Sequence, residues 1–77
     1  MARTKPEIEI GFRAAEEFRR LQMSQNVSLK KICTQTGIKK NRFYAWSEGQ
    51  APGARALQAL HYAGADVIYI LTGRKCK

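Results

Sequence analysis

The residues best suited to contact another molecule lie together between Ser28 and Gly49, in the middle of the chain. Apolar side chains at helical spacing precede and follow the short stretch 36–38, and the second apolar pattern begins within a basic run. That run is Lys39-Lys40-Asn41-Arg42. Lysine and arginine neutralise phosphates, and asparagine and arginine can hydrogen-bond the edges of bases. The local chemistry therefore favours a nucleic acid as the partner.

The distribution of charge supports a polyanionic partner. The chain carries a formal net charge of +8, and no acidic residue occurs between Phe18 and Ser47. That window holds seven basic residues: Arg19, Arg20, Lys30, Lys31, Lys39, Lys40 and Arg42. A solubilising surface is the alternative, but the excess charge is concentrated where the apolar patterns and the basic run coincide. We expect the end of the first helix to join the same basic surface.

The elements that would position this run are helices. Apolar spacing and capping residues predict helices over 6–23, 29–35, 39–47, 54–63 and 67–72, with Ser28 and Asp66 as N-caps. Gly37 supplies the sharp turn between the second and third helices. A very short strand over 7–10 is the local alternative, because glutamate and isoleucine alternate there. We predict an all-α fold of five helices.

The same spacing predicts which side chains form the core. In the first helix the stripe is Ile10, Ala14, Phe18 and Leu21, with Glu9, Arg13, Glu16 and Arg20 facing away. Phe43 and Trp46 lie opposite the basic face, so packing in the core is favoured for them over stacking on bases. In the last helix Val67, Ile70 and Leu71 face inward by spacing. Ile68 and Tyr69 would then be exposed or covered by a second subunit.

Several classes of function are disfavoured by what the chain lacks. Cys33 and Cys76 are isolated, which favours a reduced, cytoplasmic compartment without disulfides. His61 is the single histidine, and it forms no metal-ligand spacing with the cysteines. No nucleophile with a base, no glycine-rich phosphate loop and no apolar run of membrane-spanning length is evident. We therefore expect no catalytic residue, no metal, no cofactor, no small-molecule ligand and no membrane association.

Taken together, these features resemble the lambda-repressor-like helix-turn-helix family, of the Cro/CI or XRE type common in phages. The residues that carry the resemblance span about 8–74: Cys33 four positions before Gly37, then Ile38, Phe43, Trp46, Gly49 and Pro52, and the ending Gly64-Ala65-Asp66-Val67-Ile68-Tyr69-Ile70-Leu71-Thr72-Gly73. Two positions depart from the family pattern. Cys33 replaces the usual alanine, and Ser47 replaces a glutamate that usually pairs with an arginine of the first helix.

The resemblance implies a compact five-helix domain over 6–73 with a central helix-turn-helix, preceded by a flexible basic arm at 1–5 and followed by a basic tail at 74–77. The start of the third helix would enter the major groove. Base edges would then be contacted by Lys40, Asn41, Arg42 and Tyr44, and DNA phosphates by Ser28, Lys30, Lys31, Lys39, Gln50 and Arg55. A homodimer would form through Ile68 and Tyr69.

The function implied is that of a sequence-specific regulator of transcription that binds double-stranded DNA. The family likeness suggests a phage or prophage Cro-like repressor that acts by occupying an operator in the cytoplasm of a bacterial host, at the nucleoid. Two alternatives remain open. One is an antitoxin-type protein that also docks a partner protein through its last helix, and the other is a helix-turn-helix module that binds only protein.

Overall fold

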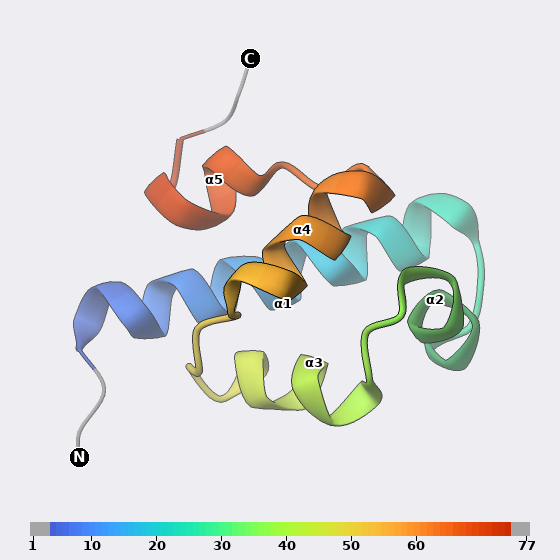
Figure 1. Ribbon diagram of the computed structural model, residues 1–77, viewed down its shortest axis with the longest axis horizontal. Coiled ribbons are helices and arrows are strands. Elements are labelled where there is room, and N and C mark those ends of the chain that lie inside the picture. The colour runs from blue at the N-terminus through green and yellow to red at the C-terminus, as the bar shows by residue number, and fades with distance from the viewer. Residues whose placement is uncertain (1–3, 75–77) are drawn as a thin grey trace.

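Five helices make up the structure, a computed structural model that describes residues 4–74 (Figure 1). They are α1 (Lys5–Gln25), α2 (Leu29–Thr36), α3 (Lys40–Ser47), α4 (Ala54–Ala63) and α5 (Val67–Thr72). No strand occurs within the described residues. The predicted all-α class and the five helices are therefore confirmed, and the alternative strand over 7–10 is wrong. Residues 1–3 of the predicted arm and 75–77 of the predicted tail, including Cys76, lie outside the described residues.

α1 extends across the molecule, with α2 and α3 on one side of it and α5 on the other (Figure 1). It begins one residue before the predicted start, where Thr4 accepts a 3.4 Å hydrogen bond from the backbone N–H of Glu7. It also continues two residues beyond the predicted end. Asn26 terminates it by adopting a left-handed backbone conformation. Asparagine tolerates this conformation better than most residues do.

The core is organised around Phe18, which is fully buried. Its ring lies 5.3 Å from that of Phe43 and 6.1 Å from that of Trp46, the latter in an edge-to-face arrangement. Trp46 is 2% exposed, so the prediction that Phe43 and Trp46 pack in the core is confirmed. Such aromatic contacts contribute about 0.5–1.5 kcal/mol each beyond the burial of area. They fix α3 against α1 and leave its opposite side free.

A close backbone approach brings α1 against the segment that follows α3. Gly11 is buried, and a Cβ atom built on it would lie only 2.6 Å from the carbonyl oxygen of Gln50. Any side chain at position 11 would push the two segments apart, since that neighbour is backbone rather than a flexible side chain. Glycine at this position therefore sets the distance between α1 and the end of α3.

α5 covers a face of α1 that the sequence predicted to point away from the core. Arg13 Nε donates to the carbonyl oxygen of Ile70 at 2.9 Å, and the hydroxyl of Tyr69 donates to Glu16 Oε2 at 2.6 Å. Glu16 and Arg20 are exposed, as predicted for residues that face away from the core, but Arg13 is half-buried, and the side chains of Arg13 and Glu16 attach α5 to α1. Leu71 is also a correction. It is 45% exposed, whereas spacing placed it inward.

Candidate nucleic-acid interface

The turn between α2 and α3 is built by local interactions that the sequence largely predicted. Ser28 Oγ accepts from the backbone N–H of Lys31 at 3.1 Å, which confirms it as the N-cap of α2. Gly37 ends α2 with φ of +75°, in the region that glycine tolerates best. Thr36 Oγ1 donates to the carbonyl oxygen of Ile32 and accepts from the N–H of Ile38. Because the Ile38 side chain is itself buried, the turn is anchored to the core.

The burial of Phe43 and Trp46 determines which residues of α3 face solvent. An α-helix advances about 100° per residue, so the side opposite these two carries Asn41, Tyr44 and Glu48. All three are exposed, and Tyr44 is 51% exposed. Two of the four predicted base-reading residues, Asn41 and Tyr44, therefore lie on the outward face, where the ring of Tyr44 also lies 5.6 Å from that of Phe43.

Glu48 on this outward face was missed by the sequence analysis. Helical spacing alone could have identified it, because positions 41, 44 and 48 fall on one face of a helix. A carboxylate there would repel a phosphate, but it can accept a hydrogen bond from the amino group of cytosine.

The other two predicted base-reading residues lie at the flanks of α3 and not on its outward face. Lys40 lines a shallow hollow between α2 and α3 together with Lys30 and Lys39. Arg42 lines a separate hollow on the α4 side, together with Lys39 and Arg55. The four residues thus face three directions, although they are close in sequence.

The predicted phosphate-binding residues are only partly brought together. Lys30, Lys39 and Arg55 surround the turn and line the two hollows beside α3. Lys31 is exposed on α2 but lines neither hollow. Gln50 follows the C-terminal end of α3, so about 12 Å of helix separates it from Lys39 at the other end. Ser28 uses its hydroxyl oxygen to cap α2.

The end of α1 contributes less to the basic surface than its acid-free sequence suggested. Arg19 lies over the ring of Phe43, 5.6 Å from its centroid, and so adjoins α3. Arg20 instead donates through Nε and Nη2 to the buried carboxylate of Glu17 at 3.0 and 2.9 Å. This hydrogen-bonded pair, formed beside α5, raises the pKa of the Arg20 guanidinium. Of the two arginines, only Arg19 lies on the α3 side.

The two sequence departures have modest structural consequences. Cys33 is half-buried in the hollow with Lys30 and Lys40. Burial raises the pKa of its thiol, and the nearby charge of Lys40 acts in the opposite direction. Ser47 donates its hydroxyl hydrogen to the carbonyl oxygen of Phe43 at 3.1 Å, so this position satisfies its polar group within α3.

Across residues 4–74, no group of three or more histidine, cysteine, aspartate or glutamate side chains is placed to hold a metal ion. Over the same span, none of the helices has the length and apolarity needed to cross a membrane. Comparison of the chain with protein-family models, with curated proteins and with solved structures gives no match.

Proposed function

We propose that this protein is a sequence-specific, double-stranded DNA-binding regulator of transcription. The observation that carries the proposal is the placement of exposed cations on both sides of an outward-facing α3. Lys30 and Lys40 lie on the α2 side, Arg42 and Arg55 lie on the α4 side, and Lys39 lines the hollows on both sides. A helix presenting polar side chains between two basic flanks matches the width of the major groove between two phosphate backbones.

In this proposal α2 and α3 form a helix-turn-helix unit of the lambda-repressor-like type. α3 enters the major groove, and Asn41 and Tyr44 approach base edges. Lys30 and the other flanking cations contact phosphates, which position the protein without reading sequence. Repression follows from occupancy, because a protein seated on an operator excludes polymerase from the same DNA. An origin in a phage or prophage, and action in a bacterial cytoplasm, remain part of the same proposal.

A homodimer completes the proposed function. Helix-turn-helix proteins of this type commonly bind paired half-sites about one helical turn apart. Ile68 is 54% exposed on α5, and Leu71, three residues later on the same helix, is 45% exposed. This apolar pair supports α5 as the contact between subunits. The hydroxyl of Tyr69 is instead directed to Glu16, so Ile68 and Leu71 replace Ile68 and Tyr69 as the central residues of the proposed interface.

The same apolar pair supports the second candidate function, an antitoxin-type protein that docks a different protein on α5. The two candidates are distinguished by what occupies α5. Sedimentation of the purified chain alone shows a concentration-dependent dimer in the first case. A monomer that associates stoichiometrically with one co-purified toxin-like partner supports the second.

The decisive experiment measures binding to random duplex DNA as a function of salt. Each neutralised phosphate contributes about 0.9 to the slope of log affinity against log salt concentration, so several contacts give a steep slope. Lys30→Ala lowers affinity for all sequences alike. Asn41→Ala relaxes preference at one base pair, costing about 1–3 kcal/mol if the contact is bidentate.

Arg74→Ala is the matched control, because the substitution removes one positive charge equally and Arg74 follows α5, the helix on the side of α1 opposite α3 (Figure 1). Its affinity should remain close to that of the wild type. Absence of duplex binding at low salt would reject the proposed function. Selection of bound sequences from a random duplex pool then gives the operator and shows whether it is palindromic.

A further inference from the structure

A groove between the start of α3 and the start of α4 gathers three basic side chains from two separate segments of the chain. Lys39 immediately precedes α3, Arg42 lies in its first turn, and Arg55 lies in the first turn of α4. These residues line a hollow of about 420 Å³, here called the α3–α4 groove. Its remaining lining is mostly small or apolar: Gly37, Ile38, Gly53, Ala56 and Ala59.

Among the residues that the structure describes, no salt bridge joins an acidic side chain to Lys39, Arg42 or Arg55. Within residues 4–74, the salt bridges join Arg13 to Glu9 and Arg20 to Glu17, and neither involves a residue of the α3–α4 groove. None of the residues that line the groove is acidic. Three like charges around one hollow repel each other, and the repulsion is relieved when an anion occupies the hollow. The groove is therefore suited to an anion before any particular ligand is considered.

The backbone at this groove adds to the positive potential. Side chains cap the other three helices, through Thr4, Ser28 and Asp66, but no side chain caps α3 or α4. The first N–H groups of both helices thus lack a side-chain acceptor, and both helix dipoles present their positive ends. A Cβ atom built on Gly53 would meet no atom within 4 Å, so there is open space at the start of α4.

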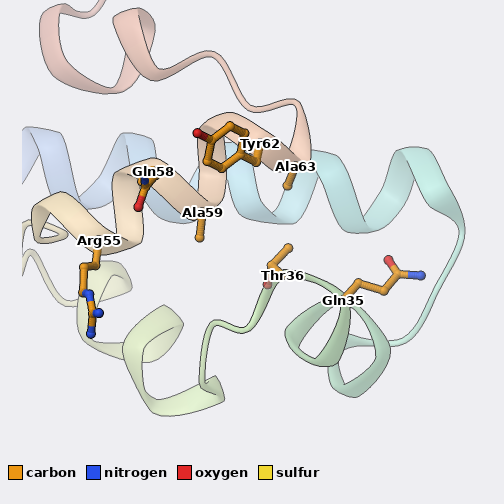
Figure 2. A pocket seen from close by; sticks show the side chains of 7 residues that line it. All are labelled: Gln35, Thr36, Arg55, Gln58, Ala59, Tyr62 and Ala63. Carbon is orange, nitrogen blue, oxygen red and sulfur yellow. The ribbon is translucent and has the colours of Figure 1, made fainter.

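An adjoining hollow shows where the charge is concentrated. Figure 2 shows its lining, with Arg55 extending from α4 toward α3 and Tyr62 near the other end of the same helix. The two hollows share Arg55 and Ala59, but Arg55 is the single cation that lines the hollow that extends to Tyr62. An anion is consequently favoured at the Lys39 and Arg42 end and not toward Tyr62.

We propose that the α3–α4 groove binds one phosphate group, held jointly by Lys39, Arg42 and Arg55. The planar arginine side chain donates two parallel hydrogen bonds to phosphate oxygens, which suits Arg42 and Arg55 to this task. The assignment rests on the proposed function where it identifies the phosphate as one of the backbone of duplex DNA. Arg42 is then a positioning residue, and sequence is read by the outward-facing Asn41 and Tyr44.

The first test does not require DNA. Inorganic phosphate is titrated into the isotope-labelled full chain, and backbone amide shifts are followed by NMR. Saturable shifts are expected at the amides of Lys39, Gly53 and Arg55, which line the groove where the two helices begin. Failure of these amides to respond overturns the proposal.

The Gly53→Asp variant provides a control against misfolding. Aspartate is a favourable N-cap, so the thermal midpoint should stay the same or rise, while its carboxylate places a negative charge in the groove. Loss of the phosphate-induced shifts together with retained stability supports the proposal, because a folding defect cannot produce that combination. Unchanged phosphate binding by this variant contradicts it.

The second test uses duplex DNA. Arg42→Ala is expected to lower affinity by the same factor for selected and random duplexes, and to reduce the salt slope by about one. A duplex in which one backbone phosphate is replaced by a neutral methylphosphonate should lose affinity by a similar factor. When the Arg42→Ala variant binds the modified duplex, the loss of affinity should be no larger than the loss caused by either change alone. Loss of preference at one base pair, with unchanged affinity for random duplex, overturns the assignment of Arg42.

The two tests separate failure of this inference from failure of the proposed function. Phosphate-induced shifts without duplex binding reject the DNA-binding function and leave the phosphate site intact. Duplex binding without any effect of Arg42 or Arg55 on the salt slope leaves the function intact and rejects the site.

Discussion

The Glu17 carboxylate accepts a hydrogen bond from the backbone N–H of Asp66, with 2.9 Å between Oε1 and the nitrogen. Glu17 is 1% exposed and also accepts from the guanidinium of Arg20. Asp66 in turn caps α5 by accepting from the N–H of Tyr69 at 3.0 Å. One buried carboxylate of α1 therefore holds the segment from which α5 begins.

Replacement of Glu17 should destabilise the protein, because its carboxylate is buried and hydrogen-bonded. Glu17→Ala leaves the N–H of Asp66 and part of the Arg20 guanidinium without their acceptor, at a cost of about 1–3 kcal/mol for the buried donor. Glu17→Gln retains an acceptor for the N–H of Asp66 and should lower the free energy of unfolding by less than Glu17→Ala does. Urea unfolding measures both, and equal midpoints for the two variants would show that this hydrogen bond is unimportant.

Gly11→Ala should also destabilise, although alanine is the better helix former by about 1 kcal/mol. The added Cβ would lie 2.6 Å from the carbonyl oxygen of Gln50, so α1 and the segment after α3 must separate. Gly53→Ala is the control, because its Cβ meets no neighbouring atom and its φ is −79°. Thermal unfolding should place Gly11→Ala well below both the wild type and Gly53→Ala. A midpoint at or above that of the wild type would contradict the close approach.

Tyr69 should ionise at higher pH in the folded chain than in the unfolded chain. Its hydrogen bond to Glu16, together with partial burial, raises the pKa of its hydroxyl above the usual value of about 10. The folded chain therefore keeps this proton longer than the unfolded chain does. The associated stability is present below about pH 10 and is lost as pH rises through the raised pKa.

Ultraviolet absorbance of tyrosinate measures this ionisation directly. Tyr69→Phe should remove a component that ionises above about pH 10, whereas Tyr62→Phe, at a side chain 78% exposed, should leave that component unchanged. If Tyr69→Phe removes no such component, the hydrogen bond to Glu16 does not persist in solution.

Ile68→Glu should alter association without affecting the fold. Ile68 is 54% exposed, so a charged side chain can occupy the position without entering the core. Sedimentation equilibrium is expected to show a lower apparent mass for this variant than for the wild type at the same concentration. Met23→Glu, at a 70% exposed residue near the end of α1, is the matched control and should behave as the wild type. Equal apparent masses for all three proteins would contradict the proposal that α5 forms the subunit interface.

Local chemistry within the sequence was enough to locate the helices and much of their capping. Ser28 and Asp66 cap helices through their own side chains, and Gly37 turns the chain through its own backbone. These interactions span only a few residues, so they can be predicted without knowledge of the tertiary structure. The burial of Phe43 and Trp46 was likewise predictable, because helical spacing assigns both to one face.

Tertiary structure decided what depends on segments distant in sequence. Glu17 is buried because α5 packs over it, and Leu71 is exposed because polar contacts from Arg13 and Glu16 fix how α5 lies on α1. Arg42 and Arg55 line one groove because the loop after α3 reverses the chain and brings α4 back beside the turn between α2 and α3. Helical periodicity reports the face of a single helix, whereas these relationships require the position of its neighbours. The sequence alone therefore determined the basic, helical surface, and packing decided how Lys40, Asn41, Arg42 and Tyr44 are divided among its faces.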